Sequence, residues 1–180
     1  MRKRISFSGE HQELTQIAAH HSDVADALQI YFSPEDGRYH ARFAGYSLAE
    51  LKDELHSRLA EVDRTSALSV LSALEAAFRI DYLQRCYAKK KDRVSRAFWT
   101  IYKHKGPRPA LKEDILTVWR RESTTPVTLI SALKDAFHYR HWLAHGRYWT
   151  PRLGRKYDYE SVYALAQTVL SSFPFEEAEA

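Results

Sequence analysis

The sequence predicts an all-α protein, an antiparallel bundle of about five or six helices. Two observations indicate this fold class. From Tyr46 to Lys105 the chain has neither glycine nor proline and is rich in Leu, Ala, Glu, Lys and Arg, which lose little entropy in a helix. Apolar residues also recur three and four positions apart, the spacing of one helix face. With 180 residues, 44% of them apolar, the chain is expected to bury one core.

The first forty-five residues are expected to form an N-terminal extension of less regular structure. Ile5–Ser8 has the length of a short strand, and residues 10–31 are typical of one or two helices. Pro34–Gly37 has the composition of a turn. From Arg38 to Phe43 polar and apolar residues alternate, which suits an edge strand or an extended connector. A short strand or β-hairpin is therefore compatible with this segment.

The stretch without glycine and proline is expected to form three helices, at about 47–62, 66–90 and 92–103. Ser47 and Glu50 have the spacing of a capping box, in which two side chains bind the free backbone donors of a first turn. Asp63–Ser66 offers a second set of cap residues, so a break is expected there. Gly106 and Pro107 end the third helix.

Three further helices follow in the second half of the helical domain, which we expect over residues 46–173. Pro109 lies near the first turn of a short helix, and Pro126 begins a longer one that stops at Gly146. Asp158 is expected to cap the last helix. Residues 174–180 form an acidic tail that is expected to fray.

Composition and charge argue against a disulfide-stabilised, a secreted or a membrane-spanning protein. The chain has 27 Lys plus Arg against 23 Asp plus Glu, a formal net charge of +4. Its single cysteine, Cys86, cannot form an internal disulfide, and packing in the core is its expected role. No signal peptide follows the basic start, and no apolar run reaches the ~18 residues of a membrane span. The lone thiol and these absences lead us to expect a cytoplasmic protein. No glycine-rich phosphate loop is present, and no cofactor is expected.

Residues 138–149, with the sequence HYRHWLAHGRYW, carry the densest set of chemically active side chains. Arg140 falls at the centre of the apolar stripe of its helix, where an unpaired guanidinium is costly, so an acidic partner or a polar cavity is expected. His141 and His145 lie one turn apart on a neighbouring face. Arg140 and His145 are about 140° apart around the helix axis. They converge only if the helix frays at Gly146 or a second copy contributes.

The pattern Arg140-His141-x-x-x-His145 at the end of a helix resembles the Arg-x(4 to 6)-His motif of HEPN-domain ribonucleases. That superfamily includes toxins of toxin–antitoxin and anti-phage defence systems, and the resemblance covers about residues 47–172. It implies metal-independent cleavage of single-stranded or loop RNA. In that reaction a ribose 2′-hydroxyl attacks the adjacent phosphate and leaves a 2′,3′-cyclic phosphate.

The resemblance also implies roles and partners. His145 would act as general base or acid, Arg140 would stabilise the phosphate, and His141 would orient the substrate or transfer a second proton. Members of the family commonly dimerise so that two motifs face each other across a two-fold axis. The implied partners are therefore RNA, a second copy of the chain with a composite active site, and an antitoxin or other regulatory protein.

Two other interpretations of the motif stay open. Histidines four residues apart can bind zinc, but Trp142 stands where the zinc motif has Glu, and no third ligand is evident nearby, so no metal site is predicted. The same scaffold also suits a non-catalytic RNA-binding or protein-interaction module. His138 is more typical of an ordinary surface or core histidine.

Acidic and basic residues on the preceding long helix are candidates for supporting the site. Glu75 and Arg79 have the i, i+4 spacing of an ion pair, which on most helices is simply solvated. Alternatively, Glu75 or Asp81 reaches Arg140 or a histidine and holds it in place. In related HEPN families an acidic or polar residue on that helix supports the site, so Glu75, Arg79 and Asp81 are predicted as supporting residues.

Two basic segments are predicted to contact RNA. Residues 85–108 contain nine Lys and Arg against one acidic residue, and residues 138–157 contain five against none. Aromatic residues lie among them, and cations with flat rings are what single-stranded RNA binding uses. The residues predicted to bind RNA are Arg147, Tyr148, Trp149, Lys89, Lys90 and Arg93.

Overall fold

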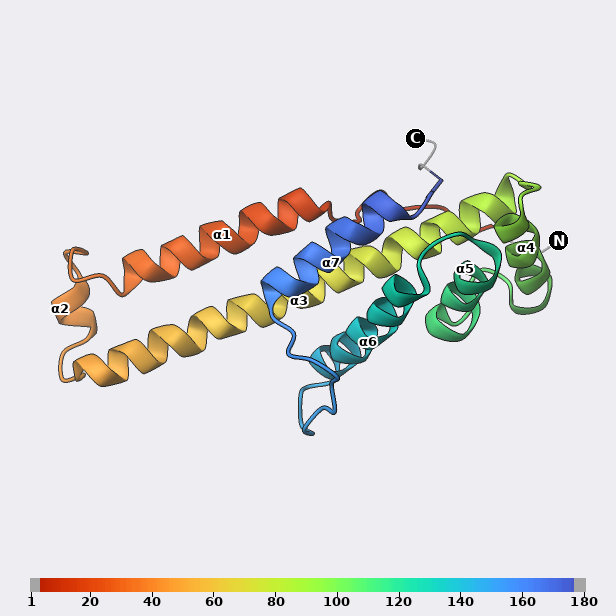
Figure 1. The fold of residues 1–180 in the computed structure, drawn as a ribbon. Coiled ribbons are helices and arrows are strands. Elements are labelled where there is room, and N and C mark those ends of the chain that lie inside the picture. The colour runs from red at the N-terminus through yellow and green to blue at the C-terminus, as the bar shows by residue number, and fades with distance from the viewer. Residues whose placement is uncertain (1–3, 177–180) are drawn as a thin grey trace.

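The computed structural model describes residues 4–176 (Figure 1). Its helices are α1 (Leu14–Tyr31), α2 (Tyr39–Arg42), α3 (Leu48–Tyr87), α4 (Arg93–Lys105), α5 (Leu116–Glu122), α6 (Val127–Ala144) and α7 (Tyr159–Ser172). A π-helical turn, η1 (Leu111–Ile115), leads directly into α5. No strand occurs within residues 4–176, so the predicted all-α class is confirmed.

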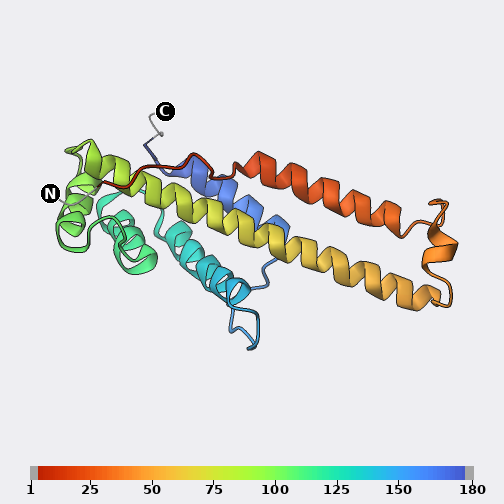
Figure 2. The same ribbon diagram turned by 180° about the vertical axis from the view of Figure 1, so that it is seen from behind.

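Helix α3 is the spine of the molecule, as the front and back views show (Figures 1 and 2). Helix α1 runs antiparallel to its first half, and the two helices form an arm that ends at α2. Helix α6 also runs antiparallel to α3, and α7 returns in the same direction as α3. Helices α4 and α5 pack at the far end of α3, which makes that end the thick part of the bundle.

The second half of α3 organises the hydrophobic core. The largest side chains that are completely buried include Trp119, Tyr82, Phe78, Phe98 and Leu71. They come from α3, α4 and α5, and burial of each such side chain contributes about 1.5 to 3 kcal/mol. Leu14 and Ile17 join the same core, so α1 belongs to the bundle at its first turns. None of the helices in the described part of the chain has the length and apolar content needed to cross a membrane.

The predicted break at Asp63–Ser66 is wrong, because α3 is one continuous helix of 40 residues. Neither glycine nor proline interrupts it, and the cap-type side chains there form other bonds. The Thr65 hydroxyl donates to the carbonyl oxygens of Glu61 and Val62, both at 3.0 Å. The Asp63 carboxylate lies 2.9 Å from His21 Nε2 on α1. Cap-type residues therefore do not end a helix when no glycine or proline interrupts it and their side chains find other partners.

The strands considered for the N-terminal segment are absent from the described residues. Ile5–Ser8 is irregular, and its backbone finds a side chain instead of a strand, since the Ile5 N–H donates to the Tyr87 hydroxyl at 2.8 Å. Residues 39–42 form the short helix α2 rather than an edge strand. The ring of Phe43 stacks on Phe32 with centroids 5.0 Å apart, which folds this segment back against the end of α1.

Three of the predicted helix ends are confirmed, at Ser47, Gly106 and Asp158. Ser47 and Glu50 form the predicted capping box, and the Asp158 carboxylate accepts a hydrogen bond from the Ser161 N–H at 3.0 Å. Gly106 ends α4 with φ of +72°. These residues act through local backbone chemistry, which a sequence pattern can report.

Candidate functional site

The predicted motif lies at the C-terminal end of α6 and in the turn that follows. Ile130, Leu133, Ala136 and Phe137 bury one face of this helix in the core, which fixes where its last turn points. The helix ends at Ala144, and the chain then turns sharply through Gly146, whose φ is +83°. The left-handed conformation is easy for glycine and explains the stop predicted from sequence.

Arg140 meets the acidic partner that its position on the apolar stripe requires. Its side chain is 33% exposed, and its Nη2 lies 3.4 Å from the Glu75 carboxylate on α3. Glu75 also accepts a hydrogen bond from Arg79 Nε at 2.8 Å, and Arg79 Nη1 donates to the Pro109 carbonyl at 3.1 Å. The predicted supporting residues Glu75 and Arg79 therefore lie beside Arg140. One carboxylate serves two guanidinium groups, so this cluster keeps a net positive charge.

One donor of Arg140 is left without a partner. Its Nε is buried and makes no hydrogen bond to any described residue. A buried N–H without an acceptor costs about 1 to 3 kcal/mol, and such groups are few in native proteins and are found at strained or functional sites. Arg140 is therefore held by Glu75 at one end of its guanidinium and unsatisfied at another.

His141 and His145 form an exposed pair at the end of α6. Their ring centroids are 4.2 Å apart, and the Trp149 ring lies 6.0 Å from that of His141. Loss of solvation and the positive charges of His145 and Lys112 lower the pKa of His141. A lowered pKa keeps that imidazole neutral near pH 7 and able to accept a proton. Within residues 4–176 no group of three or more His, Cys, Asp or Glu side chains could hold a metal ion.

Lys112 is a neighbour of this pair that the sequence analysis missed. It belongs to η1 and is half-buried, and this burial lowers the pKa of its amine. Its charge acts on His141, 29 residues later in the chain. No local pattern marks Lys112, because it comes near α6 only in the folded chain, where its charge interacts with Asp135 and His141.

The residues just after α6 differ in their hydrogen bonds and in their exposure to solvent. Arg147 forms a two-pronged ion pair with Glu61 on α3, with distances of 2.6 and 2.9 Å, and this bond lowers the pKa of Glu61. The carbonyl of Trp149 accepts a hydrogen bond from Trp142 Nε1 at 2.7 Å. Tyr148 is 85% exposed, with its ring edge-on to Trp149. The turn is thus pinned at both ends and presents Tyr148 to solvent.

The remaining predicted residues lie elsewhere. Asp81 is completely buried beside Arg85 and the C-terminal segment, not beside Arg140. Lys90 pairs with Glu176 at 3.0 Å and Arg93 with Glu122 at 3.2 Å, at the opposite end of the bundle from the motif. Along α3, Lys89 follows Glu75 by 14 residues and Glu61 by 28, which correspond to about 21 and 42 Å of helix. The two predicted basic segments therefore form two separate surfaces.

The arrangement suits proton transfer beside a bound anion. At the end of α6 it combines an anchored arginine that has an unpartnered donor with two adjacent imidazoles, and Lys112 of η1 adds a positive charge nearby. Comparisons of this chain with protein-family models, with curated proteins and with solved structures find no match.

Proposed function

We propose that the chain is a metal-independent endoribonuclease that cleaves single-stranded or loop RNA at the Arg140–His145 motif. The observation that carries the proposal is the Arg140 guanidinium, anchored by Glu75 but with a buried unpartnered Nε, on the same last turns of α6 as the exposed His141–His145 pair. A phosphate would provide acceptors for the exposed part of this guanidinium, whose side chain is 33% exposed, and imidazoles would provide the proton transfers.

The reaction proposed is transfer of the phosphate within the RNA. One imidazole takes the proton of the ribose 2′-hydroxyl as its oxygen bonds to phosphorus, and the bond from phosphorus to the 5′-oxygen of the next nucleotide breaks. A second imidazole, protonated, donates to that leaving oxygen. The products are a 2′,3′-cyclic phosphate and a 5′-hydroxyl. The lowered pKa of His141 suits the accepting role, which leaves the donating role to His145.

Arg140 stabilises the negative charge that builds on the phosphoryl oxygens during this transfer. Glu75 holds the guanidinium so that it needs no reorganisation when the substrate binds. Because Arg140 turns toward α3 while His145 is exposed at the helix end, we propose that the complete site is composite. Arg140 of one protomer and His145 of its partner would share one phosphate across a two-fold axis.

The test is cleavage of a structured RNA with single-stranded loops by the purified protein in the presence of EDTA. We expect cleavage by the wild type, and a loss of at least about 100-fold in Arg140→Ala and in His145→Ala. His138→Ala is the matched control, because His138 is an exposed histidine on the same helix outside the motif. A 3′ product end that resists phosphatase until acid treatment identifies the cyclic phosphate.

Three results would contradict the proposal. RNA binding without cleavage by the wild type indicates a non-catalytic binding module. Cleavage that EDTA abolishes indicates metal chemistry at the His141–His145 pair. Equal activity in all variants places the reaction elsewhere.

A mixing experiment tests the composite site separately. In a mixture of Arg140→Ala and His145→Ala protomers, half of the dimers are mixed, and each mixed dimer holds one intact Arg–His pair. Activity of about a quarter of the wild type is therefore expected after subunit exchange. No recovery on mixing means that each protomer builds its own site.

A further inference from the structure

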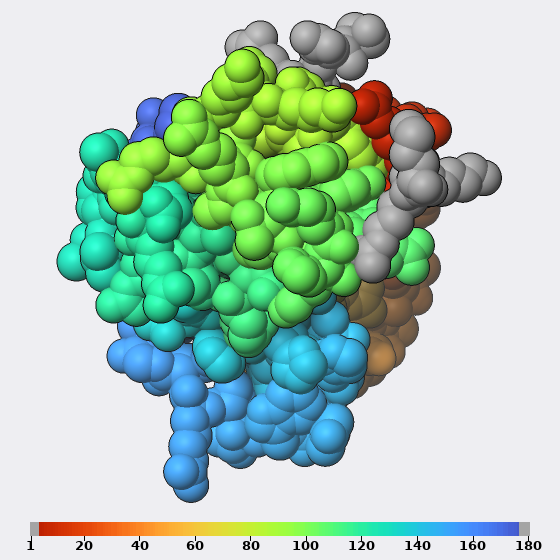
Figure 3. All heavy atoms as spheres, turned by 90° about the vertical axis from the view of Figure 1, so that its right-hand side faces the viewer, coloured from red at the N-terminus to blue at the C-terminus, as the bar shows by residue number. Residues whose placement is uncertain are grey.

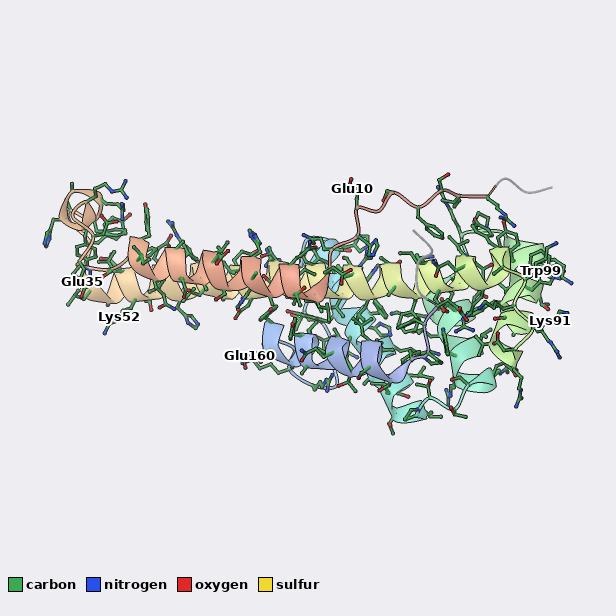
Figure 4. The ribbon with its side chains drawn as sticks, turned by 90° about the horizontal axis from the view of Figure 1, so that it is seen from above. Glu10, Glu35, Lys52, Lys91, Trp99 and Glu160 are labelled. Atoms are coloured by element: carbon green, nitrogen blue, oxygen red, sulfur yellow. The ribbon has the colours of Figure 1, made fainter. Side chains whose placement is uncertain are left out.

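The turn between α3 and α4 and the outer face of α4 form a second basic surface, far from the motif. Its core is a groove of about 540 Å³ lined by Lys89, Lys90, Arg96, Trp99 and Thr100, here called the α4 groove. Figure 4 shows Lys91 and Trp99 together at this end of the molecule, while Lys52 lies at the opposite end of α3. Lys103 follows Arg96 by seven residues and Trp99 by four, so it extends the same face of the helix.

Most cations of this surface are available to a ligand. Helix α4 contains no acidic residue. Of the cations that line the groove, Lys90 is held by Glu176. No carboxylate in residues 4–176 pairs with Lys89, Arg96 or Lys103. Within residues 4–176, the α4 groove and the adjoining Lys103 therefore present three cations that no carboxylate pairs with, which favours a polyanionic ligand.

Lys89 occupies a backbone conformation that normally belongs to glycine. Its φ is +51°, and the Lys89 and Lys90 N–H groups donate to the carbonyls of Cys86 and Arg85, closing the end of α3. Glycine is the usual residue at this position because a side chain there is strained by about 1 to 2 kcal/mol. A lysine at this place carries that strain and points to a use for its charge.

Trp99 provides a flat ring beside these cations. Its side chain is 37% exposed, and its ring stacks on Tyr102 with an angle of 9° between the planes and 5.6 Å between the centroids. Tyr102 itself is buried and packs edge-on to Tyr87. One face of the indole is thus packed on the buried ring of Tyr102, and this contact makes the indole a rigid platform for a base.

We propose that the α4 groove is a second binding site for single-stranded RNA, separate from the cleavage motif. Lys89, Arg96 and Lys103 would contact phosphates, and Trp99 would stack on a base. This combination of unpaired cations with an aromatic platform is how proteins bind single strands without reading their sequence. An acidic protein segment would use the cations but would have no need of the indole platform.

The position of the α4 groove specifies the substrate class, and this step rests on the proposed ribonuclease function. Figure 3 shows the green segments of this end and the blue segment after α6 exposed on one side of the molecule. Glu75, which binds Arg140, lies about 21 Å from Lys89 along the axis of α3. Glu61, which binds Arg147, lies about 42 Å from Lys89 along the same axis. At about 3.4 Å per stacked nucleotide, a strand needs roughly 6 to 12 nucleotides to connect the two surfaces. Longer single strands are therefore the preferred substrates.

Binding is measured by fluorescence anisotropy with labelled 2′-O-methyl RNA of about 4 and about 20 nucleotides. These oligonucleotides lack the attacking hydroxyl, so the measurement does not depend on cleavage. Lys89→Gly relieves the strained backbone while it removes the charge, so its melting temperature should equal or exceed that of the wild type. Lys52→Ala, about 56 Å away along α3, is the control for loss of one exposed lysine.

For the 20-nucleotide strand we expect Trp99→Ala to weaken binding by about 10-fold. Lys89→Gly and Arg96→Ala should each lower the slope of log affinity against log salt by about 0.7. Lys52→Ala should leave both quantities unchanged. In the cleavage assay, Trp99→Ala, Lys89→Gly and Arg96→Ala should slow cleavage of the 20-nucleotide RNA and leave cleavage of the 4-nucleotide RNA unaltered.

Wild-type affinity in Lys89→Gly, Arg96→Ala and Trp99→Ala overturns the proposal, whether or not RNA is cleaved. Displacement of RNA by an equal charge concentration of poly-glutamate, together with no effect of Trp99→Ala, also overturns it and indicates an acidic protein partner. Conversely, groove-dependent binding by a wild type that cleaves no RNA supports the α4 groove and contradicts the proposed nuclease alone.

Discussion

Replacement of Asp81 by asparagine should change how the stability of the fold depends on pH. The Asp81 side chain is 1% exposed, and its Oδ1 accepts hydrogen bonds from Arg85 Nε at 2.8 Å and from the Glu176 N–H at 2.9 Å. Its Oδ2 is buried and has no partner among the described residues. The carboxylate is therefore only partly compensated for the loss of water.

Burial raises the pKa of Asp81 from 3.8 to about 6, although Arg85 and the Glu176 N–H act in the opposite direction. Between these two values the folded chain holds a proton that the unfolded chain releases. The free energy of unfolding must therefore decrease as the pH rises through this window. The difference of roughly two pKa units corresponds to about 3 kcal/mol in total, of which about 2 kcal/mol falls between pH 4.5 and 7.

The measurement is urea unfolding, followed by tryptophan fluorescence, at several pH values from 4.5 to 7. The amide of the substituted asparagine would keep an acceptor for Arg85 but would not ionise, so the stability of Asp81→Asn relative to the wild type should increase by about 2 kcal/mol across the range. Asp23→Asn, at an exposed position of α1, controls for the loss of one negative charge. Parallel curves for wild type and Asp81→Asn would refute the reasoning. Cleavage of RNA by Asp81→Asn should match that of the wild type, because Asp81 supports the C-terminal segment.

Three further variants test the arm, the helix end and the anchor of Arg140. Thr65→Pro should cost at least about 3 kcal/mol in thermal unfolding, because α3 is continuous there, whereas a chain with a break at that point would lose little. Gly146→Ala should cost about 1 kcal/mol through its φ of +83° alone, since no atom lies within 4 Å of the added methyl group, and Gly154→Ala, which lacks a positive φ, should be neutral or stabilising. Glu75→Gln should slow RNA cleavage by about 10- to 100-fold through misplacement of Arg140, and an unchanged rate would show that this anchor is dispensable.

The parts of the fold that follow local backbone chemistry could be predicted. Ser47, Gly106, Pro126 and Asp158 act on the donors and acceptors of their own helix ends, so their patterns identify those ends. The same reasoning failed at Asp63–Ser66, because a cap residue permits a helix start but does not require one. It failed again at residues 38–43, where the rings of Tyr39 and Phe43 meet across one turn of helix and Phe43 stacks on Phe32 after α1, so the aromatic residues serve a helical turn and not a strand.

For the candidate site, too, the sequence predicted some of the neighbouring residues and missed others. The placement of Arg140 on an apolar stripe required a carboxylate, and Glu75 supplies it. Asp81 could not supply it as well, because six residues separate it from Glu75, and this spacing turns the two side chains about 120° apart around α3. Lys112 had no sequence signal, since its effect on His141 depends on a charge interaction between residues that are 29 positions apart in the chain.

Helix content, most helix ends and the chemical character of residues 138–149 follow from the residue pattern, because propensity, capping and periodicity act within a few residues of the chain. The packing of helices settles the rest. It makes α3 one helix, buries Asp81 under the C-terminal segment and ties Arg147 to Glu61. It also places the two basic segments about 21 to 42 Å apart along α3. Distances between side chains far apart in sequence depend on which helix faces meet, and no short pattern encodes that geometry.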